Sequence, residues 1–151
     1  MTRLHLVPLF VLASLLCACA AVPSAPNRTV AVAGAPKAAG PYSQGVVSNG
    51  FLFTAGITPR DPVSGDMVST DIKVSTTRVL DSLESILAGA GCSFKDVVKV
   101  TVYMSDVGDF AKMNEVYGAR FGESRPARST IQVAKLPGNA TLEIEMVARL
   151  P

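Results

Sequence analysis

Histidine, tryptophan and cysteine are scarce in this sequence of 151 residues. The one histidine is His5, tryptophan is absent, and Cys92 is the only cysteine beyond residue 19. A chain without its first 19 residues can therefore form no Ser-His-Asp triad, no histidine-ligated metal site and no internal disulfide. Cys92 has no histidine to activate it, so we interpret it as a structural loop residue. We expect no metal and no cofactor.

Charge of one sign is not concentrated anywhere in the sequence. Without Arg3 the 14 basic residues become 13, against 12 acidic residues. No stretch forms the basic stripe of a nucleic-acid-binding protein, and no glycine-rich phosphate loop ends in Gly-Lys-Ser. Nucleic acid is therefore not an expected partner.

Residues 1–19 have the composition of a secretory signal peptide. A basic start containing Arg3 precedes an apolar run over residues 4–16, and small residues follow. Leu16-Cys17-Ala18-Cys19 is similar to the lipobox of bacterial lipoproteins, which predicts lipid attachment at Cys19. Cys17 occupies a position where alanine, serine or threonine is usual, and ordinary cleavage after Ala20 is the alternative.

Residues 20–34 are rich in alanine, proline and valine and are expected to form a flexible tether. Together with the signal peptide, this segment predicts an exported, periplasmic protein that is anchored to a membrane by lipid. A soluble periplasmic or secreted protein is the alternative.

Hydrophobic periodicity predicts one α+β domain over residues 35–151. Two short strands are expected within 44–54, and others over 97–104, 129–136 and 141–150. Helices are expected from a cap at Ser69 or Thr70 to Gly89, and over 109–122. This order gives a single sheet with two helices on one face. The other face needs a cover, so we expect a homo-oligomer.

Two acidic side chains lie on the last predicted strand. Glu143 and Glu145 are two residues apart and point to the same face, opposite the apolar residues that face the helices. Arg128 opens the preceding strand, and its guanidinium can bind a planar carboxylate through two hydrogen bonds. From this pattern alone, an Arg-Glu ion pair across a subunit interface is the alternative to a binding site.

The chain contains, in order, APKAAGPYSQG (35–45), DVVKVTVY (96–103), PARSTI (126–131), AKLP (134–137) and LEI (142–144). In sequence and spacing these stretches resemble the motifs of the Rid family, the YjgF-type reactive intermediate deaminases. The resemblance covers about residues 35–150. It implies a chorismate-mutase-like fold, a homotrimer with sites between subunits, and hydrolysis of 2-imino acids such as 2-iminobutanoate and 2-iminopropanoate to 2-oxo acids and ammonia.

The resemblance also implies roles for individual residues. Arg128 matches the arginine that binds the substrate carboxylate. Glu143 matches the glutamate that positions or deprotonates water and passes a proton to the departing nitrogen. Tyr42 matches a pocket tyrosine, and Thr130 stands where many members have a cysteine that contributes mainly backbone contacts. Ala55 replaces a serine, and the lost hydroxyl would weaken transition-state binding by roughly 1.5–3 kcal/mol.

Two other functions are compatible with these residues. The same pocket without turnover would make an exported module that binds a small carboxylate, which the alanine at position 55 favours. Nuclease or translation-inhibitor activity is disfavoured by the absence of a basic surface. Arg128 and Glu143 are expected roughly 15–20 Å apart along the strand direction within one chain, so a site shared between subunits is predicted.

Overall fold

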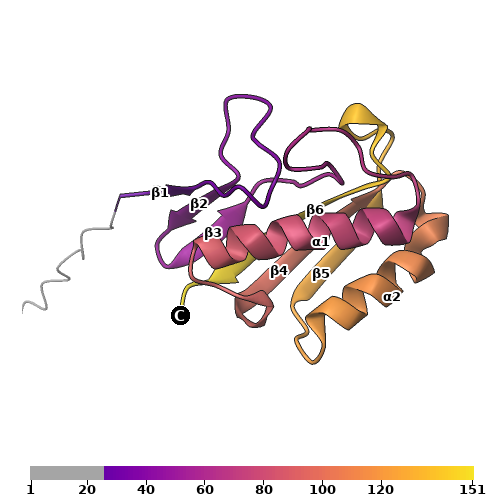
Figure 1. Cartoon of the computed structure of the whole chain (residues 1–151). Helices are drawn as coiled ribbons and strands as arrows, with labels where there is room; N and C mark the ends of the chain where they lie inside the picture. The colour runs from indigo at the N-terminus through magenta and orange to yellow at the C-terminus, as the bar shows by residue number, and fades with distance from the viewer. Residues whose placement is uncertain (1–25) are drawn as a thin grey trace, which may run out of the picture.

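The computed structural model describes residues 26–151 (Figure 1). The predicted signal peptide and Cys19 lie outside the described residues. One six-stranded sheet and two α-helices form the domain. In chain order the elements are β1 (Arg28–Val30), β2 (Gly45–Ser48), β3 (Phe51–Thr54), α1 (Ile72–Gly89), β4 (Val97–Met104), α2 (Phe110–Phe121), β5 (Ala127–Gln132) and β6 (Leu142–Arg149), with short 3-10 turns η1 (Phe94–Asp96), η2 (Val107–Asp109) and η3 (Pro137–Asn139).

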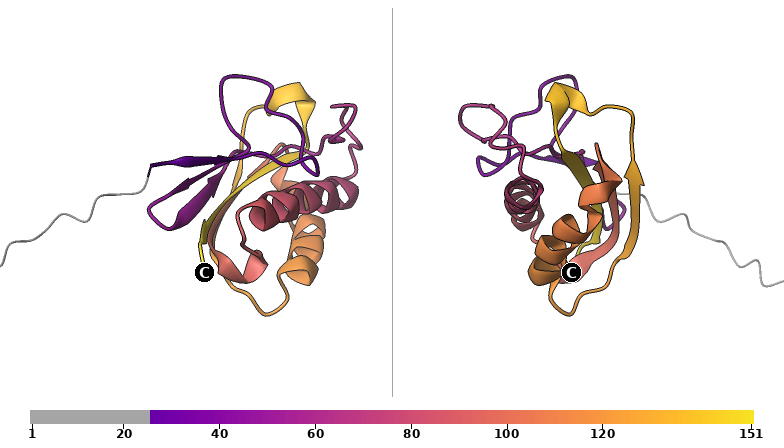
Figure 2. Two further views of the ribbon diagram at one scale, coloured as in Figure 1. Left: turned by 60° about the vertical axis from the view of Figure 1, so that its left-hand side comes forward. Right: turned by 90° about the vertical axis from the view of Figure 1, so that its right-hand side faces the viewer.

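Both helices lie on the same side of the sheet (Figure 2). The apolar side chains of β4 and β6 that alternate toward α1 and α2 are fully buried, among them Val100, Val102 and Ile144. Leu80, Leu83 and other apolar residues of α1 complete this core. The apolar face of the strands and the apolar face of α1 therefore pack together in one core layer, which confirms the expected α+β arrangement.

Helix α1 begins one residue after the position that the sequence suggested. Asp71 is the N-cap, and its carboxylate accepts hydrogen bonds from the backbone N–H groups of Lys73 and Val74. The predicted cap at Ser69 or Thr70 is wrong, because aspartate at the next position can reach two free N–H groups of the first turn. The helix ends at Gly89 as expected.

The segment expected to be a tether is part of the domain from Arg28 onward. Strand β1 pairs with β2 in antiparallel fashion, with Arg28 opposite Val47. Val30 and Ala35 are 3% and 1% exposed. The expected boundary at residue 35 is therefore too late. An edge strand buries few side chains, so its composition can resemble that of a linker.

The strand order is β1-β2-β3-β6-β4-β5, with β5 at one edge. Strands β4 and β5 are parallel, whereas β6 pairs with β4 in antiparallel fashion on its other side. Strand β5 ends at Gln132, four residues before the predicted end at residue 136. Consequently β5 and β6 run in opposite directions but are separated by β4.

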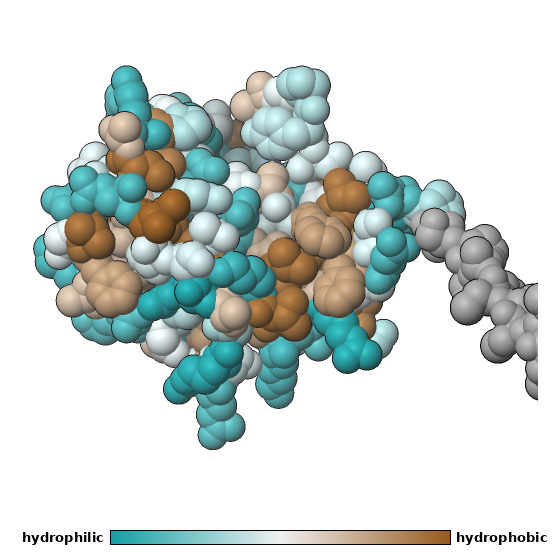
Figure 3. Space-filling model, turned by 180° about the vertical axis from the view of Figure 1, so that it is seen from behind, coloured by the Kyte–Doolittle hydropathy of each residue, from teal (hydrophilic) through white to brown (hydrophobic). Residues whose placement is uncertain are grey.

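The sheet face opposite the helices has no cover from residues 26–151. Phe53 on β3 and Ile131 on β5 are 47% and 46% exposed on this face. Apolar side chains gather over β2 and β3 when the molecule is viewed from this side (Figure 3). Contiguous exposed apolar surface of this kind marks an interaction site. Among the described residues, no helix has the length and hydropathy to cross a membrane.

Candidate active site

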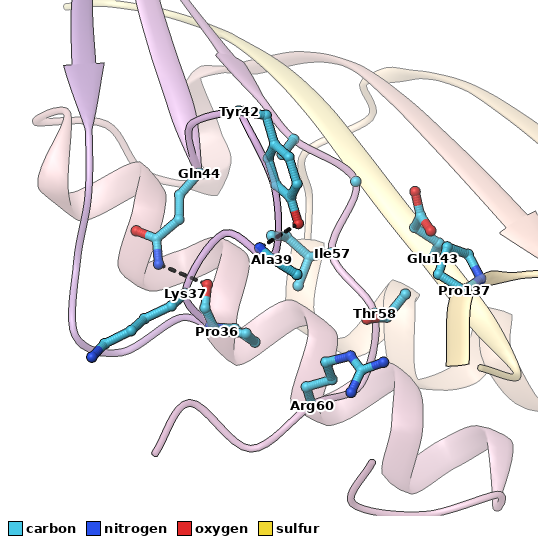
Figure 4. Close-up of a pocket in the computed structure, with 12 residues that line it drawn as sticks. Pro36, Lys37, Ala39, Tyr42, Gln44, Ile57, Thr58, Arg60, Pro137 and Glu143 are labelled. Atoms are coloured by element: carbon cyan, nitrogen blue, oxygen red, sulfur yellow. Dashed lines mark hydrogen bonds between the residues drawn. The ribbon is translucent and has the colours of Figure 1, made fainter. Parts of the chain in front are cut away.

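A cavity of about 430 Å³ lies beside the first residues of β6 (Figure 4). We call it the Glu143 cavity. Its walls come from residues 36–44, from residues 55–60 after β3, and from Pro137 and Glu143. Three residues that the sequence singled out, Tyr42, Ala55 and Glu143, therefore meet here. The cavity belongs to loops, in keeping with the general placement of binding residues on loops held by a rigid sheet.

Gln44 holds the loop that carries Tyr42. Its side-chain oxygen accepts a hydrogen bond from the N–H of Val32, and its amide nitrogen donates to the carbonyls of Val32, Ala35 and Pro36. Gln44 is 5% exposed, so these bonds are shielded from water. The Tyr42 hydroxyl in turn accepts from the N–H of Ala39 at 3.1 Å. One buried amide thus fixes a loop that has no regular structure.

Glu143 is half-buried in the wall of the cavity and lies against the backbone of Gly56. A Cβ at position 56 would collide with the Glu143 carboxylate. Residues Ile57 and Ile144 exchange backbone hydrogen bonds at 2.9 and 3.1 Å, which holds the Gly56 segment beside β6. Burial raises the pKa of Glu143, and the nearby charge of Glu145 raises it further. A carboxylate with a raised pKa is a stronger base than an ordinary glutamate and can return the proton that it takes.

Arg60 and Thr58 also line the cavity, and no pattern in the sequence points to either of them. Both lie in a Pro- and Asp-rich loop without periodicity. The Arg60 guanidinium donates from Nη1 to the carbonyl of Gly65 at 2.7 Å and packs against Gly138. Figure 4 shows it directed toward the side of the cavity where Pro137 and Glu143 lie.

Arg128 does not line the Glu143 cavity. Its side chain lies against α2, where Nη2 donates to Asn114 Oδ1 at 2.7 Å. The guanidinium carbon is 4.4 Å from the ring centroid of Tyr117 and 5.6 Å from that of Phe110. We call this group of four residues the Arg128 corner. Stacking on the rings and the bond to Asn114 hold the guanidinium without neutralising it.

Two hydroxyl groups near Arg128 are buried without a hydrogen-bond partner among residues 26–151. They are Tyr117 Oη and Thr130 Oγ1. Thr130 is on the same face of β5 as Arg128, two residues along. Burial raises the pKa of Tyr117 to about 12. Unsatisfied buried hydroxyl groups are uncommon in folded proteins, so a ligand or a neighbouring chain at this position would supply what they lack.

Arg128 and Glu143 lie on opposite faces of the sheet. In the strand register Arg128 is level with Val100 of β4, which faces the helices, and Glu143 is level with Tyr103, which faces away from them. The offset is three residues, or about 10 Å along the strands, with β4 between them. The expected 15–20 Å is therefore too long, because β5 ends early. The two side chains also lie on opposite faces of the sheet, and this separates them more than the offset along the strands does.

Within the described chain Arg128 forms an ion pair with neither Glu143 nor Glu145, and an Arg-Glu ion pair across a subunit interface stays the alternative to a binding site. The ion pairs of residues 26–151 involve other groups, such as Lys73 with Glu115. Glu145 instead accepts a hydrogen bond from Tyr103 Oη at 3.1 Å on the uncovered sheet face. Among the same residues, no three histidine, cysteine, aspartate or glutamate side chains cluster as metal ligands.

Cys92 is buried, and burial raises the pKa of its thiol. Its Sγ donates to the carbonyl of Arg149 at 3.8 Å. A thiol that is held protonated is a poor nucleophile. This environment agrees with the structural role that the sequence suggested.

Comparisons with known proteins identify relatives over nearly the whole described domain. The family model described as Endoribonuclease L-PSP matches residues 32–150. A RutC family protein of Pyrococcus horikoshii is 53% identical over 114 residues, which is 76% of this chain and 90% of the relative. The human 2-iminobutanoate/2-iminopropanoate deaminase is 41% identical over 122 residues, or 81% of this chain and 89% of the human protein.

A solved structure of E. coli TdcF with bound serine has the same fold. It is 38% identical to this chain, with a TM-score of 0.78, and the match covers 82% of this chain and 99% of TdcF. This likeness confirms the expected chorismate-mutase-like arrangement of one mixed sheet and two helices.

Proposed function

Because this chain belongs to the endoribonuclease L-PSP family, also called the YjgF or Rid family, we propose that it hydrolyses 2-imino acids to 2-oxo acids and ammonia. The observation that carries this proposal is the position of Glu143, half-buried in a cavity wall with a raised pKa. The relative solved with bound serine supports the substrate class, because an amino acid carries its nitrogen next to a carboxylate, as a 2-imino acid does.

The proposed reaction needs few protein groups. Water adds to the carbon of the C=N bond, the C–N bond then breaks, and ammonia leaves as the C=O bond forms. Glu143 takes a proton from the attacking water and returns it to the departing nitrogen. The protonated imine is already electrophilic, so orienting the carboxylate and placing one water are the remaining tasks. Arg128 binds the carboxylate through its two parallel N–H groups.

We also propose that each site is shared between neighbouring copies in a homotrimer. Within one chain the two groups lie on opposite sheet faces, so they cannot hold the same small molecule. Arg128 is on the edge strand β5, where a second copy can approach it. The exposed apolar residues of the uncovered face, such as Phe53 and Ile131, support association through that face. A carboxylate bound at the Arg128 corner, on the helix side of β5, would be a partner for the unsatisfied Tyr117 and Thr130 hydroxyls.

The test combines two inactive variants. Arg128→Ala should abolish ammonia release from 2-iminopropanoate, and Glu143→Gln should retain binding while lowering kcat by about 100-fold or more. Co-expression of the two variants, each with its own tag, should restore activity, since random mixing rebuilds roughly a quarter of the sites from intact halves. Mixed oligomers that stay inactive would disprove the shared site. Full activity of Arg128→Ala would disprove the assignment of Arg128.

The second candidate function is a module that binds small carboxylates with little turnover. Ala55 favours it, because the cavity wall presents a methyl group where many relatives are expected to carry a hydroxyl. Binding of propanoate or serine by calorimetry, with no acceleration of imine hydrolysis by the purified chain, would identify this function. Retention of Glu143 in the cavity favours the enzyme, since a binder of anions gains nothing from a nearby carboxylate.

Export with lipid attachment at Cys19 is a separate proposal, which rests on the sequence of residues 1–19. The Cys19→Ala variant should move the protein from the membrane fraction to the soluble fraction. Soluble unmutated protein that begins at Ala21 would contradict lipid attachment and leave export standing.

A further inference from the structure

The wall of the Glu143 cavity contains an arginine, Arg60, that has no role in the proposed reaction. The charged residues of the cavity wall are Lys37, Arg60 and Glu143. Arg128 of a neighbouring copy already accounts for the carboxylate next to the imine in the proposed function. The guanidinium of Arg60 is therefore surplus to a substrate with a single carboxylate.

The Arg60 guanidinium is held in place but not neutralised. Its Nη1 is anchored to the carbonyl of Gly65 at 2.7 Å, and its Nη2 edge packs on Gly138 in η3. Among residues 26–151 no carboxylate lies within ion-pair distance of it, and Nε and Nη2 have no protein hydrogen-bond acceptor. A fixed guanidinium with free donors is suited to binding a carboxylate with little loss of side-chain entropy.

Lys37 does not share this position. It is exposed, and its side chain runs away from Glu143 in Figure 4. Arg60, in contrast, is partly buried and directed toward the Glu143 side. The two cations of the cavity wall thus differ in direction, which makes Lys37 a matched control for Arg60.

We propose that Arg60 binds a second carboxylate at the far end of the substrate side chain, so that the preferred substrates are 2-imino dicarboxylic acids of four or five carbons. This inference rests on the proposed function and names its substrate class. The second carboxylate takes no part in bond breaking: water still adds to the C=N carbon and ammonia still leaves. Arg60 is a specificity-determining residue, whose bond to the substrate is made equally before and during the reaction.

The experiment compares kcat/KM for 2-iminosuccinate and 2-iminopropanoate, formed in the assay from aspartate and alanine by amino acid oxidases. Arg60→Met should lower kcat/KM for 2-iminosuccinate by about 10- to 100-fold, chiefly through KM, and change that for 2-iminopropanoate by less than about twofold. Arg60→Lys should restore part of the preference because it keeps the charge. Lys37→Met should leave the ratio of the two substrates unchanged.

Inhibition gives a readout that does not depend on forming the second imine. Succinate should inhibit 2-iminopropanoate hydrolysis more strongly than propanoate does in the unmutated protein, and Arg60→Met should remove this difference. If Arg60 only stabilises its loop through Gly65, its loss should affect both substrates equally, and the inference is then wrong. Equal hydrolysis of both substrates by the unmutated protein also overturns it while leaving the proposed function intact. No hydrolysis of either imine overturns both.

Discussion

The Glu143 cavity and the Arg128 corner are built in different ways. The cavity is assembled from loops that are held by one buried amide, Gln44, and by the close approach of Gly56 to Glu143. The corner is assembled on a helix, where the rings of Phe110 and Tyr117 and the amide of Asn114 surround the guanidinium. The cavity thus places a carboxyl group in a half-buried wall, and the corner places a guanidinium at the edge of the sheet.

Each region also lacks what the other provides. No arginine within the described chain pairs with Glu143, and no described carboxylate pairs with Arg128. A site that is divided in this way depends on precise placement of both halves. The cavity should be sensitive to small changes in backbone packing. The corner should tolerate the loss of any one of its several contacts.

Gly56→Ala should have the largest effect, because the added Cβ would displace the Glu143 carboxylate. No left-handed backbone conformation is required at this glycine, so the collision is the main cause. We expect kcat to fall by about 100-fold, the usual result of misplacing a catalytic group by about 1 Å. The measurement is ammonia release under substrate saturation.

The control for Gly56→Ala is the same change in a Glu143→Ala background. Removal of the carboxylate leaves room for the Cβ, so the double variant should regain the thermal stability that Gly56→Ala loses. If both backgrounds lose the same stability, the glycine is needed for the backbone rather than for Glu143.

Ala55→Ser should increase activity, and it tests whether the cavity is an incomplete active site. A hydroxyl at this position would add one hydrogen bond to a charged substrate or to the attacking water. Such a bond contributes roughly 1.5–3 kcal/mol, which corresponds to about a 10- to 100-fold rise in kcat/KM. A fall in kcat/KM, with unchanged stability, would mean that the cavity is adapted to the methyl group.

Asn114→Ala should weaken the corner by a smaller amount. The guanidinium loses one hydrogen bond but keeps its contacts with the two rings. We expect KM to rise about three- to tenfold with little change in kcat, because the carboxylate is bound equally in ground and transition states. Glu115→Ala is the matched control on the same helix, since it removes only an exposed ion pair with Lys73. A fall in kcat without a change in KM would contradict this role.

The sequence predicts these two regions to different extents for a physical reason. Periodicity is local, so the strand over residues 97–104 and the end of α1 at Gly89 could be predicted from neighbouring residues alone. The insertion of β4 between β5 and β6 could not, because connection length does not determine which strands pair. Strand β5 pairs in parallel with β4, the strand before it, and not with β6 after it, so no hairpin extends β5 to the predicted end at residue 136.

The candidate site shows the same limit. Motif similarity found Tyr42, Ala55 and Glu143, which the fold brings together, but it could not show that Arg128 faces the helices instead. The sequence did not identify Arg60 and Gly56 as site residues, because loop residues show no periodic pattern. Their importance depends on contacts that form only on folding: Arg60 lies against Gly138, and Gly56 lies against the Glu143 carboxylate.

The smallest predicted effect is a shift in pH dependence, and it separates the two causes that raise the pKa of Glu143. Burial is the larger cause and the charge of Glu145 is the second. Glu143 must be ionised to take a proton from water. A raised pKa therefore moves the acid limb of the pH profile of kcat/KM to higher pH than an ordinary glutamate would give.

The Glu145→Gln variant removes the charge of Glu145 and should move the acid limb of this profile partway to lower pH. The value of kcat/KM on the plateau at higher pH should stay the same. The amide oxygen of the substituted side chain can still accept the hydrogen bond that Tyr103 donates to Glu145, so the fold should be preserved. An acid limb that does not move would mean that another group controls it, and the Glu143 cavity would then hold the substrate without supplying the base.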